Sequence, residues 1–379
     1  MKILHTINIA AIAGAENYLL QLLPALQKSG ITVALWFAYK KKDKAIAQHY
    51  LQKMQAAGIP TTSHQVYTWV DVSIYKKLSK HILHEGFEAV HSHLIYADFW
   101  TSIIKRFYHK DIQSISCKHG YHEHTYTQHC LKPSQAPHNL YSLIYNFAEK
   151  KIDYAYACSH GLKHFHQGLG LYNSSNMQVI QHGFQYPEVE QSEAIKRTKK
   201  ENQLLLAGRL IPRKGHALLL EAVCILKKRG FNIHVWIIGT GPMQQEIEKK
   251  IDTLQLTEHV ELLGYKTDVM SYMAAADLVV VPSYCEGLPL VILEAFNSGT
   301  ACVAFDTYGC NEAIEQEVTG WLARPFDVVD FANHIADAVQ NPHKSKKIST
   351  AASERLRQYF TLNRMALETA AVYEGLLKR

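Results

Sequence analysis

The chain has 379 residues, of which 47% are hydrophobic and 20% charged, and its formal net charge is +6. This composition is typical of a globular protein, and a chain longer than about 250–300 residues usually divides into domains. No apolar run approaches the roughly 18 residues of a membrane-spanning helix, and the short, broken apolar start is unlike a signal peptide.

The first half alternates short apolar runs with helical patterns. Strands are predicted at residues 3–7, 32–39, 89–93, 114–119, 154–159 and 179–182. Helical periodicity lies between them, for example over 16–28 and 94–108. The stretch 121–137 is irregular and rich in His, Tyr, Thr and Gln, and a loop of that length is often functional.

The second half repeats the alternation after a polar stretch at 186–200, which is the predicted linker. Strands are predicted at residues 203–206, 233–238, 260–263, 278–281, 301–305 and 320–323. Repeated βα units imply a parallel sheet covered by helices in each half. We therefore expect an α/β protein with domains at 1–190 and 191–360, followed by an amphipathic helix at 361–379.

The positive charge is concentrated in the first half. Residues 1–190 carry 18 basic and 12 acidic side chains, whereas 191–379 carry 22 of each. Basic stretches at 40–44 and 105–106 lie near aromatic residues. A solvated surface explains each stretch, and contact with an anionic membrane or acceptor is the functional alternative. No nucleic-acid-binding motif accompanies the charge. The seven scattered cysteines, without a C-x-x-C pair, indicate reduced thiols in a cytosolic protein.

The most informative motif spans residues 286–294 and follows the apolar run 278–281. Its order is a buried strand, a loop with Glu286 and Gly287, and a helix whose first turn, by this prediction, contains Pro289. Free N–H groups at a helix start bind anions, and the glycine permits close approach. Glu286 and Glu294 then suit the two hydroxyl-rich ends of a nucleotide sugar. A solvated helix face is the alternative explanation of the two glutamates.

A second motif follows the first strand of the second half. Arg209, Arg213 and Lys214 place three cations between Gly208 and a following glycine. Such a group of cations is a candidate diphosphate clamp, because guanidinium and ammonium groups neutralise a departing phosphate, but Arg213 is assigned no role in it. A solvated loop is the alternative.

Gly239 and Gly241 end another predicted strand, where glycines permit close approach to a ligand. An ordinary turn explains these two glycines equally well.

Histidines are unevenly distributed, with 17 of the 22 in residues 1–190. One interpretation is a metal site, in which His91 and His93 join Asp98 or Glu123. The other places His119 at a strand end, where its neutral imidazole bonds a sugar hydroxyl. No D-x-D pattern for a diphosphate-bound cation is present, so Arg209, Lys214 and helix N-termini are expected to act without a metal.

These segments resemble the signatures of the family-4 retaining glycosyltransferases, whose two-domain architecture is called GT-B. The family pattern E-G-L-P-L-x-x-x-E matches 286–294, and G-R-(x)n-K-G matches 208–215. Residues 13–16 resemble its G-G-A-E motif, with Ala13 in place of a glycine. Residues 118–120 resemble its x-H-(G/T) element, and 307–312 resemble its glycine loop, with Tyr308-Gly309 replacing a double glycine.

The resemblance implies the fold and the role of each candidate residue. Two Rossmann-like domains would face a cleft, with the final helix crossing back to the first domain. Arg209 and Lys214 would stabilise the departing diphosphate, Glu286 would bind donor-sugar hydroxyls and Glu294 the ribose diol. Further donor contacts would come from Gly14, Gly208, Gly239, Gly241, Leu263, Tyr265, Gly287, Leu288 and Leu290.

In the first domain, His119 would position the transferred sugar, and His93 would lie on the acceptor side. The implied activity is that of a hexosyltransferase acting on a UDP- or GDP-sugar, with front-face attack and the leaving phosphate as base. Its acceptor would be a glycan or lipid-linked sugar at the inner face of the cell membrane. Two rivals remain open, a sugar-nucleotide epimerase of the same fold and a metal-dependent hydrolase built on the histidines.

Overall fold

The computed structural model describes residues 1–378 apart from 13, 70, 122–139, 173–174 and 190–191. Most of the irregular stretch 121–137 therefore lies outside the described residues. The described chain forms two compact units. Residues 1–121, 140–185 and 360–378 belong to the first unit, and residues 186–359 belong to the second.

The first unit contains a parallel sheet in the order β3-β2-β1-β4-β5-β6-β7. Its strands are β1 (Lys2–Ile9), β2 (Thr32–Lys40), β3 (Thr61–Val66), β4 (Ala89–His93), β5 (Gln113–Lys118), β6 (Tyr154–Ala157) and β7 (Met177–Val179). Its helices are α1 (Gly14–Lys28), α2 (Lys44–Ala56), α3 (Val72–Glu85), α4 (Ile95–Phe107), α5 (Leu140–Glu149), α6 (His160–Gly168) and α15 (Leu362–Leu377).

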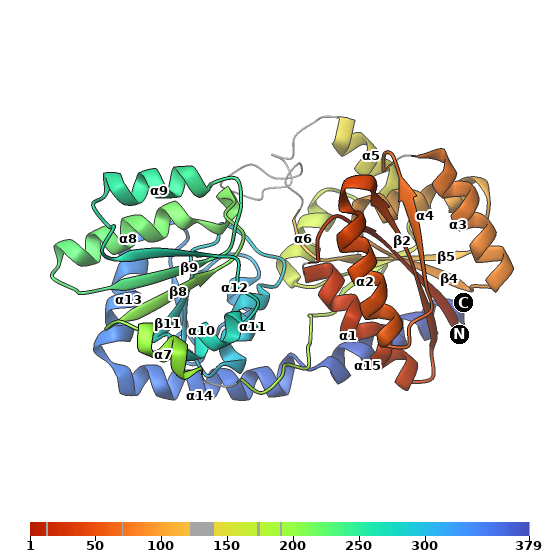
Figure 1. Ribbon diagram of the computed structural model, residues 1–379. Coiled ribbons are helices and arrows are strands. Elements are labelled where there is room, and N and C mark those ends of the chain that lie inside the picture. The colour runs from red at the N-terminus through yellow and green to blue at the C-terminus, as the bar shows by residue number, and fades with distance from the viewer. Residues whose placement is uncertain (13, 70, 122–139, 173–174, 190–191, 379) are drawn as a thin grey trace. The chain divides into compact units, whose positions relative to one another are not determined.

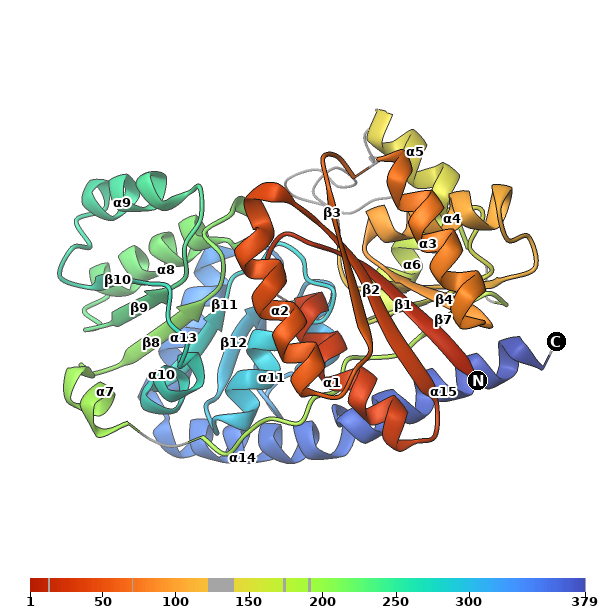
Figure 2. The ribbon, with the colours of Figure 1, turned by 45° about the vertical axis from the view of Figure 1, so that its right-hand side comes forward.

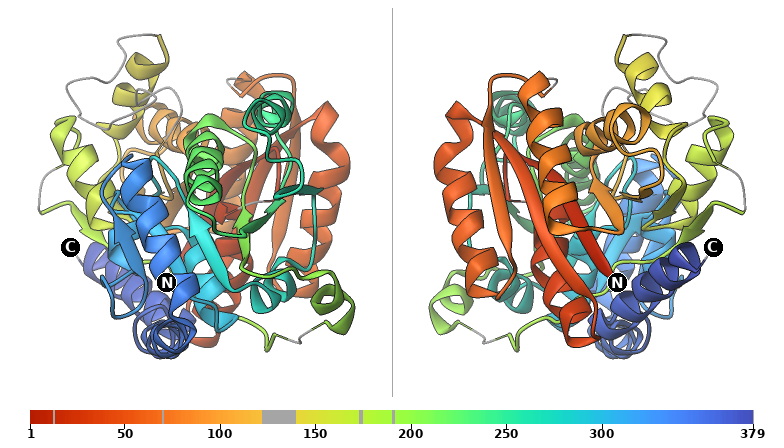
Figure 3. Two further views of the ribbon diagram at one scale, coloured as in Figure 1. Left: turned by 90° about the vertical axis from the view of Figure 1, so that its left-hand side faces the viewer. Right: turned by 90° about the vertical axis from the view of Figure 1, so that its right-hand side faces the viewer.

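Helices cover both faces of this sheet, as Figure 2 and the right-hand view of Figure 3 show. On one face, α3 and α4 pack around the buried Trp36 and Trp100. On the other face, α1 packs against α15, so the last helix of the chain completes the first unit. Because a parallel sheet is buried on both faces, its central strands are usually apolar, and the polar side chains of β1 and β4 call for a specific explanation.

The second unit contains a parallel sheet in the order β10-β9-β8-β11-β12-β13. Its strands are β8 (Gln203–Ala207), β9 (His234–Ile238), β10 (Val260–Gly264), β11 (Leu278–Val281), β12 (Cys302–Phe305) and β13 (Trp321–Ala323). Its helices are α7 (Glu193–Thr198), α8 (His216–Lys228), α9 (Gln244–Thr253), α10 (Val269–Ala275), α11 (Leu290–Asn297), α12 (Cys310–Ala313), α13 (Val328–Gln340) and α14 (Pro342–Tyr359). Short 3-10 helices span Lys41–Asp43 in the first unit and Pro212–Lys214 here.

Most predicted strands coincide with observed ones to within two residues, but three details differ. The sequence analysis missed β3, because only Val66 of that edge strand is fully buried and no apolar alternation marks it. The strand predicted at 179–182 is wrong in position, since β7 pairs with β6 over Met177–Val179 and then ends. Pro289 is the N-cap of α11 rather than part of its first turn, because its extended backbone precedes the helix and its carbonyl accepts from Ile292.

Part of the predicted linker is helical, because α7 lies within it. Its N-cap Ser192 accepts a hydrogen bond from the backbone N–H of Ile195, which explains why so short a helix forms there. Within the described part of the chain, no helix combines the length and the apolar character needed to cross a membrane.

Candidate active site

The candidate donor site lies at the carboxyl edge of the sheet in the second unit. Strand β8 stands between β9 and β11, so the strand order reverses direction there. Open α/β sheets bind ligands at such a switch point, outside the carboxyl ends of the strands. The loop after β8 carries Lys214 and the loop after β11 carries Glu286. Lys214 Nζ donates a hydrogen bond to Glu286 Oε1 at 2.6 Å.

Glu286 is a buried carboxylate, with only 6% of its surface exposed. Burial by itself would raise its pKa, but the charges of Lys214 and Arg213 and hydrogen bonds from Lys214 and Ser283 together lower the pKa of Glu286 below its usual value. A buried carboxylate that stays ionised must be paired. Glu286 is therefore held in place as an acceptor for hydrogen bonds.

Arg213 is a residue of this site that the sequence analysis left unassigned. Its charge lowers the pKa of Glu286, and its backbone carbonyl accepts from the N–H of Tyr284 in the loop after β11. The signal was present in the sequence as the middle cation of the 209–214 stretch. With Arg209 and Lys214 it gives three positive charges against the one of Glu286, which suits a diphosphate.

Glu294 lies on α11, where it is only partly exposed. Burial raises the pKa of Glu294, and the positive charge of Lys214 opposes that change. Glu294 in turn contributes, after burial, to the raised pKa of Tyr186. Both predicted glutamates therefore lie within electrostatic reach of Lys214, so the structure brings together the Glu286, Glu294 and Lys214 of the prediction.

The glycines of the site pack against the chain's own backbone. Gly239 has φ 141°, and a Cβ there would lie 1.9 Å from the carbonyl oxygen of Gly208. Gly241 makes a similar approach to Leu210, at 2.4 Å. The two glycines thus pack against the loop that carries Arg209, and their approach to a ligand stays a prediction. No side chain fits at position 239, because both the space and the backbone conformation require glycine.

Gly309 explains why one glycine suffices in the loop 307–312. Its φ is 83°, and a Cβ would lie 2.5 Å from the carbonyl oxygen of Gly287. The neighbouring Tyr308 is 45% exposed, and its carbonyl accepts from the N–H of Glu286. The loop is thus fixed against the glutamate motif, and the substitution of the first glycine by Tyr308 leaves that contact intact.

The remaining predicted donor residues occupy the same edge of the sheet. Gly287 and Leu288 precede α11, and Leu290 is its first residue. Leu263 lies near the end of β10, two strands away from β8, and Tyr265 after it is 74% exposed. Arg209 is exposed, and among the described ion pairs none involves it. The first-turn N–H groups of α11, which lack a full set of partners within the helix, and the exposed Arg209 are both candidates to bind an anion.

The candidates of the first unit lie at the start of α1, at the end of β4 and after β5. Gly14 is the exposed first residue of α1, and Ala13 before it lies outside the described residues. His119 follows β5 and is partly exposed. Its Nε2 lies 3.0 Å from Nδ1 of His93, and its Nδ1 lies 3.3 Å from Nε2 of His182. A sugar hydroxyl at His119 must therefore replace one of these two partners.

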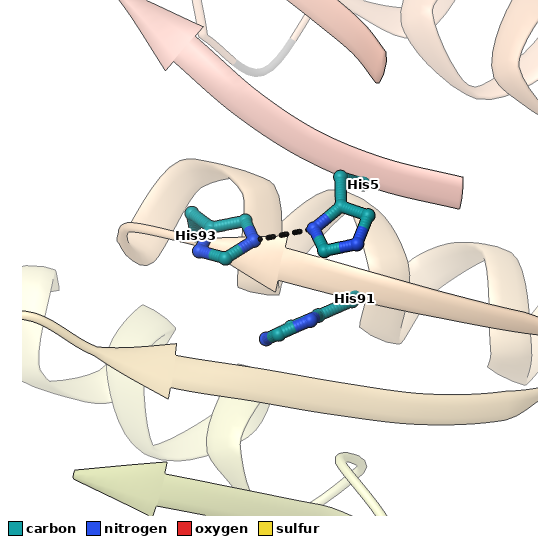
Figure 4. A group of neighbouring side chains, drawn as sticks. All are labelled: His5, His91 and His93. Atoms are coloured by element: carbon teal, nitrogen blue, oxygen red, sulfur yellow. Dashed lines mark hydrogen bonds between the residues drawn. The ribbon is translucent and has the colours of Figure 1, made fainter. Parts of the chain in front are cut away.

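His93 is fully buried, and its place on the acceptor side stays a prediction. It shares one face of the sheet with His91 and His5, which are opposite each other in the β1–β4 register. Figure 4 shows the three rings gathered between these strands, with His93 Nε2 and His5 Nδ1 3.0 Å apart. Burial lowers the pKa of each of the three rings, that of His5 to about 3, so all three are neutral.

No described carboxylate joins the histidines in the way that the metal-site interpretation requires. His5, His91 and His93 are close enough together to share an ion. Asp98, however, bonds Lys118 at 2.9 Å and also accepts from Ser92, instead of joining the rings. Glu123 lies outside the described residues. A catalytic metal keeps a position open to water, whereas these three rings are fully buried.

Lys118 is a second residue that the sequence analysis missed. It is buried between Asp98 and Glu149, and Tyr172 donates to Glu149. Burial raises the pKa of Glu149 to about 7, while Lys118 opposes the increase. This buried network fixes the end of β5 immediately before His119. In the sequence, only the Lys-His-Gly run pointed to Lys118. Its two carboxylate partners come from α4 and α5, which are distant from it in the chain.

The comparisons with known proteins agree with this geometry. Residues 12–185 match the family model described as Glycosyltransferase Family 4, and residues 188–355 match that described as Glycosyl transferases group 1. The chain is 28% identical to the alpha-D-kanosaminyltransferase of Streptomyces kanamyceticus over 46% of this chain and 45% of that protein. It is 30% identical to the UDP-Gal:alpha-D-GlcNAc-diphosphoundecaprenol alpha-1,3-galactosyltransferase of Escherichia coli over 34% of each chain. The alignments thus span less than half the length of these curated relatives.

A solved structure extends the likeness to the whole chain. Anabaena Alr3699/HepE, in complex with UDP and glucose, has a TM-score of 0.81 at 19% identity and covers 99% of this chain and 100% of its own. Likeness at that identity concerns the fold. Since the two family models together cover most of the sequence, the chain belongs to the family-4, group 1 glycosyltransferases and has their GT-B fold.

Proposed function

We propose that this protein is a retaining glycosyltransferase that moves a hexose from a nucleoside diphosphate sugar to an acceptor hydroxyl. The observation that carries the proposal is the ion pair of Lys214 with the buried Glu286 at the β8–β11 switch point. One carboxylate beside Lys214 and Arg213, with Arg209 in the same loop after β8, provides both a hydroxyl acceptor and an excess of positive charge. A sugar joined to a diphosphate needs both features in one place.

The proposed donor is a UDP-sugar. Support comes from HepE, which was solved with UDP and with UDP-glucose, and from the Escherichia coli relative, whose name specifies UDP-Gal. Arg209 and Lys214 would bind the diphosphate together with the N–H groups that begin α11. Glu286 would accept from hydroxyls of the sugar and Glu294 from the ribose diol, while Leu263 and Tyr265 would flank the base. Gly14, at the start of α1, would allow a second helix terminus to approach the phosphates.

The proposed reaction is a front-face substitution. The bond between the anomeric carbon and the diphosphate oxygen breaks, and the acceptor oxygen bonds to the same face of that carbon. The acceptor's proton passes to the departing phosphate. Lys214 and Arg209 stabilise the negative charge that develops on the leaving group, a task that fixed cations perform well because they need no reorganisation. This scheme uses no metal ion.

The proposal assigns residues 1–190 to acceptor binding, 191–360 to donor binding and 361–379 to the helix that returns to the first domain. The acceptor class is a glycan or a lipid-linked sugar, as in the Escherichia coli relative, whose named acceptor carries diphosphoundecaprenol. Peripheral attachment to an anionic membrane fits the charge of the first half. Lys40 lies 5.0 Å from the Trp69 ring centroid, and Phe107 beside Arg106 is 68% exposed.

A binding screen followed by a turnover assay tests the proposal. Ligands that bind only the folded state raise the melting temperature. UDP and UDP-sugars should therefore raise the melting temperature more than GDP, ADP and their sugars. In E286Q, the increase caused by the UDP-sugar should be reduced more than the increase caused by UDP. A preference for GDP would correct the donor base.

The turnover assay separates the transferase from an epimerase of the same fold. A transferase releases UDP only when an acceptor is present, and product analysis gives an unchanged anomeric configuration. Conversion of the UDP-sugar into its epimer in the absence of any acceptor, with the nucleotide still attached, would identify the epimerase instead.

A further inference from the structure

Five histidines and one tyrosine make a continuous series of side-chain contacts inside the first unit. We call it the imidazole relay, and its members in spatial order are His91, Tyr373, His5, His93, His119 and His182. It begins with His91, whose Nδ1 lies 2.7 Å from the Tyr373 hydroxyl on α15. That hydroxyl lies 3.3 Å from His5 Nε2, and His5 Nδ1 lies 3.0 Å from His93 Nε2.

The relay continues to the partly exposed His119. His93 Nδ1 lies 3.0 Å from His119 Nε2, and His119 Nδ1 lies 3.3 Å from His182 Nε2. Every inner histidine therefore has both ring nitrogens engaged by another member. At the two ends, His91 Nε2 and His182 Nδ1 are buried and have no hydrogen-bond partner among the described residues.

Each histidine of the relay is neutral. Burial lowers the pKa of His5 and of His182 to about 3, and it lowers the pKa of His91, His93 and His119 well below the usual value. A neutral imidazole carries one N–H and one lone pair. A ring that bonds at both nitrogens must donate on one side and accept on the other. The direction chosen by one ring is thus imposed on all the others.

We propose that this relay has a single proton order, that the order fixes the tautomer of His119, and that His93 and Tyr373 are positioning residues for His119. The inference rests on the proposed function, in which His119 contacts the transferred sugar. The geometry allows two orders. Either all five histidines carry the proton on Nδ1, with His182 as the unpaired donor, or all five carry it on Nε2, with His91 as the unpaired donor.

The environment of His119 favours the second order. The Cys117 sulfur lies 3.8 Å from His119 Nδ1. Burial raises the pKa of Cys117, so it remains a thiol, which is a weak donor. A thiol beside Nδ1 suits an unprotonated nitrogen. His119 then accepts at Nδ1, and a ligand hydroxyl that replaces His182 there must donate to it.

The hydrogen-bond accounting distinguishes the relay from a metal site. A metal bound by His5 and His93 needs a lone pair on both of the facing nitrogens, which are 3.0 Å apart. In the relay, one of these two nitrogens always carries the hydrogen-bonding proton and therefore has no lone pair to offer a metal. The same argument holds between His93 and His119. The relay is therefore complete without an ion, and metal content provides an independent test.

The test is the tautomer of each ring in the ligand-free protein labelled with 15N-histidine. Long-range couplings from the ring carbon-bound protons distinguish Nε2–H from Nδ1–H, and single histidine substitutions assign the signals. We expect all five histidines to be Nε2–H and neutral at pH 7. A mixture of tautomers among them, or zinc bound at one per chain, would overturn the relay. A uniform Nδ1–H set would overturn the acceptor role of His119.

Y373F and Y50F form a matched pair of variants. Both tyrosines are fully buried, but the Tyr50 hydroxyl donates to the backbone carbonyl of Glu16 at 3.1 Å and lies outside the relay. Y373F separates His91 from His5, so it should change the nitrogen signals of His93 and His119 and lower kcat, whereas Y50F should leave those signals in place. Equal effects of the two variants would refute a positioning role for Tyr373.

The tautomer measurement needs neither a ligand nor turnover. It is made on the wild-type protein, so it remains decisive even if the Y373F variant does not fold. Mixed tautomers in an active transferase would refute the relay alone. Uniform tautomers in a protein that transfers no sugar would refute the proposed function alone.

Discussion

Lys214 and Glu286 are 72 residues apart in the chain, yet Lys214 Nζ lies 2.6 Å from Glu286 Oε1. The contact exists because β8 and β11 are neighbours in the sheet and both loops leave its carboxyl edge. The pair couples the proposed diphosphate clamp to the proposed sugar-binding carboxylate. A change at either residue should therefore affect both catalysis and the stability of the second unit.

Lys214→Ala should lower turnover by about a hundred- to a thousandfold, because it removes one group that stabilises the leaving phosphate, at a cost of about 2.7–4 kcal/mol. It should also lower the free energy of unfolding by about 1–3 kcal/mol, since Glu286 loses a bonding partner while buried. Steady-state kinetics and urea unfolding measure the two effects.

The double variant K214A/E286Q separates the two effects of Lys214. It should recover part of the stability without recovering activity, because the neutral amide no longer needs a cation. Lys250→Ala, which removes a surface ion pair with Glu221 in the same unit, is the control and should keep its activity. Near-normal turnover in K214A would remove the clamp from the mechanism.

Activity should survive treatment with EDTA. The reason is that Arg209, Arg213 and Lys214 already supply positive charge at the predicted diphosphate position, and the sequence has no D-x-D pattern. The measurement compares UDP release before and after chelation and gel filtration. Complete loss of activity that manganese or magnesium restores would contradict this prediction.

The relay histidines should make the protein sensitive to acid. The unfolded chain binds protons at histidine near pH 6.5, whereas folded His5 and His182 bind them near pH 3. Between these values the unfolded state holds more protons, so stability increases with pH and is lost as the pH falls from 6.5 toward 3. Each such ring contributes up to about 1.4 kcal/mol per pH unit.

Urea midpoints between pH 7.5 and 5 measure this dependence. His182→Asn should reduce the slope of stability against pH by the equivalent of up to one bound proton. His49→Gln, at an exposed position, should leave that slope unchanged. A stability that is constant over this interval would show that the rings are not buried and neutral as the structure has them.

The membrane hypothesis predicts binding to anionic vesicles that decreases with salt. Each lysine near such a surface contributes about 1 kcal/mol, so replacing the exposed Lys41, Lys42 and Lys44 by Gln should weaken binding roughly a hundredfold. Replacing the exposed Lys346 and Lys347 of the second unit is the control for charge alone. Equal sedimentation with neutral and anionic lipid, or with neither, would favour an acceptor that is not in a membrane.

The sequence by itself determined the alternation of strands and helices, because apolar periodicity and turn residues are local properties. It also identified the glutamate motif and the cations at 209–214, since each lies within a few residues of a strand end. The edge strand β3 escaped detection because an edge needs little apolar surface, and Pro289 was misplaced because capping depends on one backbone angle.

Only the tertiary structure decided which of these residues meet. Strand order brings Lys214 to Glu286, and it packs Gly239 against Gly208. The histidines show the same limit. Their number in the first half was visible in the sequence, but their arrangement depends on the β1–β4 register and on Tyr373 of α15, 368 residues from His5. Contacts over such distances follow from the packing of whole elements, which no local pattern encodes.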